Sequence, residues 1–188
     1  NMAEAVAAAA ENNQIKTITI NDGANSITFQ KGGEGNFAST DLAGWTANLT
    51  TAVPIAIFQK DDNADIANAL ERAIAYVQSN KLNLPVTLPR EMKATLRKQI
   101  NLPANTKLHG NHSQVIPQVG GAFPNRTVLF LNNGSDNVEI QDIHIDMQRA
   151  ADMYGILGYT VKNVAIHDNR FTNVHSTNAN KPVSAIQF

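Results

Sequence analysis

The chain has 188 residues, a formal net charge of −1, 43% hydrophobic residues and 16% charged residues. This length can bury a good core, and the balance of residue types is that of an ordinary soluble protein. The small net charge gives no reason to expect a nucleic acid or an anionic membrane surface as a partner. No run approaches the ~18 apolar residues of a membrane span, so we expect no membrane insertion. The absence of cysteine excludes disulfides and thiolate metal sites.

Residues 1–14 are rich in alanine and therefore have a strong intrinsic helix propensity. Met2, Val6, Ala9 and Asn13 follow one another at spacings of four, three and four, which is one seam of a heptad pattern. Such a short seam is marginal by itself. Two interpretations remain open at this point: a surface helix, and the end of a coiled-coil neck that joins identical chains.

Residues 15–52 have the composition of a small β-rich region. Two β-prone runs, 15–20 and 26–30, flank a turn at Asn21-Asp22-Gly23 and predict a hairpin. The glycines of 31–35 are not followed by a Lys-Ser/Thr pair, which argues against a phosphate-binding loop. We expect Trp45, the only tryptophan, to pack between this region and the next element rather than to bind a sugar.

A strand and an amphipathic helix are predicted next. Residues 53–58 read as a strand, and Asp61-Asp62-Asn63 can cap a helix that follows. Within residues 64–78 an apolar face is formed by Ile66, Leu70, Ile74 and Val77.

From Pro85 onward the chain reads as successive short strands separated by turns. We expect strands near 86–89, 100–102, 106–109, 115–116, 128–131, 155–159 and 184–188. Residues 118–125 contain two glycines and a proline, and we expect them to form a loop.

One short pattern occurs twice in this region. Asn137–Asp146 returns twenty-six positions later as Asn163–Thr172. Each copy alternates apolar and polar residues and bends at Asp142 or Asp168, where we expect the carboxylate to bond neighbouring backbone. A repeat of this length predicts stacked coils. The residues expected to face the core are Val138, Ile140, Ile143, Ile145, Val164, Ile166 and Phe171.

The two copies, "NVEIQDIHID" and "NVAIHDNRFTNV", resemble rungs of the right-handed parallel β-helix of pectate-lyase-like proteins and bacteriophage tailspikes. The resemblance covers residues 55–188, and residues 64–78 look like the helix that closes the first coil in this family. The expected fold is mainly β: the first coils of such a β-helix with an N-terminal capping helix over 53–188, preceded by a β-rich connecting region at 15–52 and a neck helix at 1–14. We expect the chain to be a piece of a longer polypeptide.

The resemblance implies a phage tailspike or receptor-binding protein of the virion, acting outside the cell. It would recognise and depolymerise a bacterial surface polysaccharide as a homotrimer, and attach to other tail or baseplate proteins through its N-terminal side. Two alternatives remain open: a secreted polysaccharide lyase or epimerase of the same fold, and a non-enzymatic structural adhesin or adaptor of the tail. A hydrolase and a lyase are equally compatible with the pattern.

Candidate site residues follow from the strand alternation. Glu139, His144 and Asp146 should point away from the core, as should His167 and Arg170 in the second copy. A carboxylate, a histidine and an arginine on one wall could supply a base and a cation for a uronate, or two carboxylates for hydrolysis.

Outward positions of stacked coils are usually polar because they contact water, and this explanation is favoured for these side chains. If the segment contains catalytic residues, our candidates are Asp146 and His144, and the candidate substrate-binding residues are Glu139, His167 and Arg170. We expect no cofactor and no metal. His109 and His112 are three residues apart, but they have no acidic or cysteine neighbour in sequence that would complete a metal site.

Overall fold

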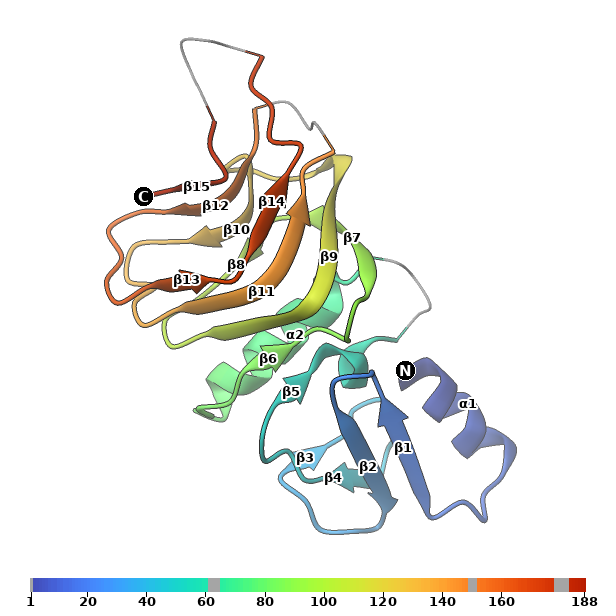
Figure 1. The fold of residues 1–188 in the computed structure, drawn as a ribbon. Coiled ribbons are helices and arrows are strands. Elements are labelled where there is room, and N and C mark those ends of the chain that lie inside the picture. The colour runs from blue at the N-terminus through green and yellow to red at the C-terminus, as the bar shows by residue number, and fades with distance from the viewer. Residues whose placement is uncertain (1, 61–64, 149–151, 178–182) are drawn as a thin grey trace.

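The computed structural model describes residues 2–60, 65–148, 152–177 and 183–188. The described chain is mainly β, with a four-stranded antiparallel sheet at the N-terminal side and two parallel sheets, of four and seven strands, above it in Figure 1. Helix α2 lies at one end of the stack of parallel strands, on the side of the antiparallel sheet (Figure 1).

The antiparallel sheet has the strand order β1-β2-β4-β3. Its strands are β1 (Thr17–Asn21), β2 (Ser26–Lys31), β3 (Phe37–Ala38) and β4 (Trp45–Ala47). Strands β1 and β2 form the predicted hairpin, and Asp22 Oδ1 holds its turn by accepting from the backbone N–H groups of Ala24 and Asn25. Trp45 is 4% exposed and belongs to the core, as predicted.

Helix α1 spans Met2–Glu11 and packs beside β1. The predicted heptad seam is divided between the interior and the surface. Met2 is buried against its own chain, while Val6 is 36% exposed and Asn13 follows the end of the helix. Part of the seam therefore packs against the rest of the same chain.

The two parallel sheets share a single core. One contains β5 (Val53–Pro54), β6 (Val86–Thr87), β7 (Lys93–Lys98), β9 (Lys107–Ala122), β11 (Glu139–Asp146), β13 (Ala165–His167) and β14 (Arg170–Thr172). The other contains β8 (Ile100–Asn101), β10 (Thr127–Leu131), β12 (Tyr154–Gly158) and β15 (Ile186–Gln187). From β8 onward the chain passes alternately through the two sheets, and every pairing within them is parallel.

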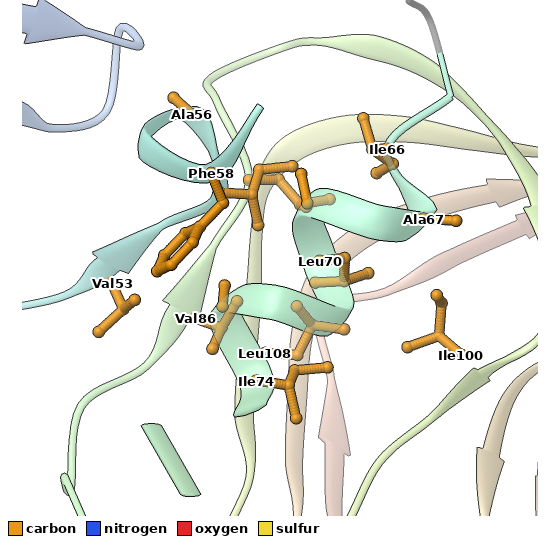
Figure 2. Packing of buried hydrophobic residues seen from close by; sticks show 14 of the residues in the cluster. Val53, Ala56, Phe58, Ile66, Ala67, Leu70, Ile74, Val86, Ile100 and Leu108 are labelled. Carbon is orange, nitrogen blue, oxygen red and sulfur yellow. The ribbon is translucent and has the colours of Figure 1, made fainter. Parts of the chain in front are cut away.

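The predicted helix is present as α2 (Ala67–Ser79). Figure 2 shows Leu70 and Ile74 of α2 among Val86, Ile100 and Leu108 from the strands. The predicted cap, 61–63, lies outside the described residues. Asp65 Oδ1 accepts from the N–H of Ala67, 3.1 Å away, and so satisfies one donor of the first turn.

Two predicted boundaries are wrong. Of the strand expected at 53–58, only Val53–Pro54 is extended, and Ile55–Phe58 forms a 3₁₀ helix (η1). A short apolar run that is buried all round does not distinguish a strand from a helix. The loop expected at 118–125 is strand as far as Ala122, because β9 continues beside β7 with a register shift at its glycine-rich end.

The repeat residues of β11 are buried as predicted: Val138, Ile140, Ile143 and Ile145 are at most 3% exposed. Their counterparts Val164, Ile166 and Phe171 also pack against the core but are only partly buried. Their strands, β13 and β14, pair with β11 on one side only, so less of each side chain is covered.

Candidate functional site

The outer face of β7, β9, β11 and β14 carries a row of polar residues. Strand register places Lys93, Gln114, His144 and Arg170 opposite one another on neighbouring strands. Asp146 lies two residues beyond His144 and opposite Thr172. Three of the five candidate residues, His144, Asp146 and Arg170, therefore come together here, and we call them the wall triad.

Asp146 is 7% exposed and is covered by the amide side chains of Gln114 in β9, Gln148 just after β11 and Asn173 just after β14. Gln114 Nε2 and Gln148 Nε2 each donate to Oδ2 over 2.9 Å, while Oδ1 accepts from Asn173 Nδ2 at 2.7 Å and from the Gln148 N–H at 3.1 Å. The Asn173 amide, together with the Gln148 donors, holds the pKa of Asp146 below its usual value. The carboxyl group is thus ionised at neutral pH and has a full set of donors.

His144 is half-buried, and its Nε2 lies 2.8 Å from Thr172 Oγ1. Burial lowers its pKa below the usual histidine value, and the Arg170 cation lowers the pKa further against the opposing effect of Asp146. The imidazole is therefore neutral at pH 7, which is the protonation state that a general base needs.

Arg170 is exposed and lies opposite His144. Within the described part of the chain, no hydrogen bond or ion pair holds its guanidinium group. A guanidinium group binds a carboxylate with paired N–H donors. A neutral base beside an unoccupied cation is the arrangement that removal of a proton next to a uronate carboxylate requires.

Glu139 and His167 lie on the other side of the bend at Asp142, apart from the wall triad. Glu139 Oε1 is 2.7 Å from His109 Nε2, so this carboxylate already has a partner inside the chain. His167 is exposed, and its Nδ1 lies 2.8 Å from Oδ2 of its neighbour Asp168. Neither residue contacts the wall triad through an interaction that the structure shows.

The bend itself is held by side-chain bonds to backbone, as expected of Asp142. Its Oδ2 accepts from the N–H of His112 at 3.1 Å, and its Oδ1 contacts the ring of the same histidine. From the second copy of the repeat, Asn169 Oδ1 accepts from the N–H of Ile143 and its amide donates to the carbonyl of Ile140. Gly110 faces the Asp142 carbonyl at this bend, where a Cβ atom would clash with it.

Several residues of this wall were not predicted. Gln114, Thr172 and Asn173 complete the surroundings of the wall triad, and His109 and His112 each find an acidic partner thirty residues along the chain. These separations are close to the spacing between paired residues of β9 and β11, so the spacing of the repeat is the signal that could have revealed them. Among the described residues, no group of three or more His, Asp or Glu side chains is placed to hold a metal ion.

Comparisons with protein-family models, curated proteins and solved structures found no match to this chain. In the described part of the chain, neither helix has the length and apolar character needed to cross a membrane.

Proposed function

We propose that residues 53–188 are the first coils of a right-handed parallel β-helix whose open end is closed by α2, and that the protein is a phage tailspike. Three features support this fold: alternation of the chain between two parallel sheets, the apolar face of α2 on the core, and a ladder of asparagines. In the ladder, Asn137 Nδ2 donates to Asn105 Oδ1 at 3.1 Å and Asn163 Nδ2 donates to Asn137 Oδ1 at 3.0 Å. Identical residues at the same turn of consecutive coils are what a solenoid produces.

The proposed activity is recognition and depolymerisation of a bacterial surface polysaccharide on the outer face of β9, β11 and β14. The single observation that carries it is the wall triad: neutral His144 lies opposite the exposed cation Arg170 and near ionised Asp146. Arg170 would bind the carboxylate of an acidic sugar, and His144 would accept the proton of the carbon that bears this carboxylate. A carbon–carbon double bond would form as the glycosidic C–O bond at the next carbon breaks, and the leaving oxygen would take a proton from the histidinium or from water.

This arrangement favours elimination over hydrolysis. Hydrolysis by two carboxyl groups needs one of them protonated as a general acid. The donors around Asp146 lower the pKa of this carboxyl and favour its ionised form, which is the wrong state for an acid. Asp146 instead positions the wall through Gln114, Gln148 and Asn173.

The test is cleavage of purified acidic surface polysaccharide, followed by chain length and by ultraviolet absorbance of the unsaturated sugar that elimination leaves. We expect Arg170→Gln to lower kcat/KM by about tenfold to a hundredfold, because a charged hydrogen bond contributes roughly 1.5–3 kcal/mol. Lys162→Gln is the matched control, since Lys162 is an exposed cation away from the wall triad. Equal cleavage by both variants would contradict the role of the wall triad.

The alternatives give different results in the same experiment. A non-enzymatic tail adhesin would bind the polysaccharide without shortening it. A secreted lyase or epimerase would be active as a monomer. We propose instead a homotrimer that is joined through the α1 side. It would be located in the virion and attach to other tail or baseplate proteins.

A further inference from the structure

A cleft lies away from the wall triad, between α2 and the sheet that contains β8 and β10. Its volume is about 690 Å³, which falls within the range of small-ligand sites. One side is formed by residues of α2 such as Ala75 and Gln78. The other side is formed by β8 and by the segments that precede and follow β10. We call it the amide cleft because six carboxamide side chains line it: Gln78, Gln99, Asn101, Asn125, Asn132 and Asn133.

Part of this lining is fixed by internal hydrogen bonds. Gln99 is 7% exposed, its Nε2 donates to Asn101 Oδ1 at 2.8 Å, and its Oε1 accepts from the N–H of Asn125 at 3.1 Å. Gln78 Nε2 donates to the carbonyl of Ala104 at 3.0 Å. These bonds hold the cleft open in one shape before any ligand arrives.

Other amides remain available to a ligand. The side chains of Asn125 and Asn133 are exposed and, within the described residues, no hydrogen bond to protein engages them. The cleft also carries no net charge, because its one carboxylate, Glu71, is paired with the ammonium group of Lys98 at 2.6 Å. A carboxamide both donates and accepts, so it matches a group that does the same, such as a sugar hydroxyl.

Apolar surface lies between these amides. Pro103 and Pro124 supply accessible apolar surface, and Leu102 and Phe130, which are 1% and 8% exposed, lie beneath it. The ring of Tyr159, which is 52% exposed, stands edge to face with that of Phe130 at a centroid distance of 5.9 Å. The apolar faces of a sugar ring can pack on such surface while its hydroxyl groups reach the amides.

We propose that the amide cleft binds an uncharged stretch of an oligosaccharide, through Asn125 and Asn133 and the apolar surface around Phe130. The inference rests on the proposed function in one respect only: the polysaccharide acted on at the wall triad would be the source of this ligand. The cleft would select neutral sugars because, among the described residues that line it, there is no cation to offset the desolvation of a sugar carboxylate.

The test uses neutral oligosaccharides of glucose, galactose, rhamnose and N-acetylglucosamine as probes, with a uronate oligosaccharide for comparison, in calorimetry and NMR titration. We expect the Asn125→Ala/Asn133→Ala double variant to bind the neutral probes about tenfold more weakly, since it removes two hydrogen-bonding side chains. Asn83→Ala, an exposed asparagine outside the cleft, should bind like the unmodified protein. Ala75→Trp should block the cleft and abolish binding, while Ser79→Trp, on the same helix but outside the lining, should not.

Each outcome separates this inference from the proposed function. If the cleft variants bind the neutral probes as the controls do, or if only a protein or peptide occupies the cleft, the amide cleft is not a saccharide site, whatever the polysaccharide assay shows. If neutral probes bind in a cleft-dependent manner but no polysaccharide is cleaved, the cleft assignment stands and the proposed activity fails. Absence of binding by every neutral probe would overturn the cleft assignment.

Discussion

At the scale of single residues, the structure gives Asp146 a structural role that its strand position did not suggest. An outward position on a strand predicts a solvated side chain, yet Asp146 is 7% exposed beneath Gln114, Gln148 and Asn173. Gln148 is only two residues away, but Gln114 and Asn173 reach Asp146 because β9, β11 and β14 pair side by side. The alternation therefore predicts which way Asp146 points, but not how deeply it is covered.

Replacing Asp146 by Asn should destabilise the fold by about 1–3 kcal/mol at pH 7, because one oxygen cannot serve four donors. The folded-state pKa lies below the unfolded value of 3.8, so this stabilisation is present above that pH and is lost as pH falls through the folded-state pKa. The free energies of unfolding of the unmodified protein and of Asp146→Asn, measured in urea from neutral pH to well below 3.8, should converge as the pH falls. Asp168→Asn, at an exposed position, is the control. A difference in unfolding free energy that stays the same at every pH would contradict a stabilising role for the ionised Asp146 carboxylate.

The asparagine ladder leads to a separate prediction at Asn137. This residue has a left-handed backbone with φ of 58°, and its side chain forms hydrogen bonds with Asn105 and Asn163. Asn137→Ala should cost about 1–3 kcal/mol through lost hydrogen bonds and backbone strain. Asn137→Gly loses the same bonds without the strain, so it should be more stable than the alanine variant. Thermal unfolding of both variants measures the difference, and equal stability would show that the backbone conformation contributes nothing.

At the scale of elements, the repeat predicted the sheets better than it predicted their ends. The core positions of β11 follow from period-two alternation, and Ile140 is fully buried. The extension of β9 to Ala122 was missed because Gly120, Gly121 and Pro124 are typical of turns, whereas pairing with β7 keeps the segment extended as far as Ala122. The residues that contact the wall triad, such as Gln114, Thr172 and Asn173, could not be identified from the sequence because the register between neighbouring strands was not known.

Ile140→Asp should destabilise the fold by several kcal/mol, because it buries a carboxylate without a partner in the core between the sheets. Gln118→Asp, at an exposed position of β9 beside Arg97, should change stability by less than about 0.5 kcal/mol. Chemical denaturation of both variants makes the comparison. Similar stability of the two would mean that Ile140 does not face the core.

At the scale of the whole molecule, one chain leaves apolar surface on the N-terminal helix. Val6 is 36% exposed on α1, whereas Met2 and Ala5 on the same helix are buried. A helix of ten residues is too short to be stable alone, and association of three copies would cover Val6 as well. The resemblance to tailspikes suggested a trimer, and we propose that the exposed part of the seam contributes to its contact.

The proposed homotrimer predicts a solution mass near three times that of one chain by light scattering at micromolar concentration. Val6→Glu should weaken the trimer by placing a charge in the contact, while Glu4→Gln serves as a control for a charge change on the same helix. A monomer that is stable at this concentration would contradict the trimer and favour a secreted lyase.

The measurement that tests the central claim most directly is binding of the protein to purified surface polysaccharides from a panel of bacterial strains, immobilised on a sensor surface. We predict saturable binding to at least one acidic polysaccharide, weakened by Arg170→Gln and unchanged by Lys162→Gln. Absence of binding to every polysaccharide, or binding that both variants weaken equally, would contradict a saccharide-binding wall on β9, β11 and β14.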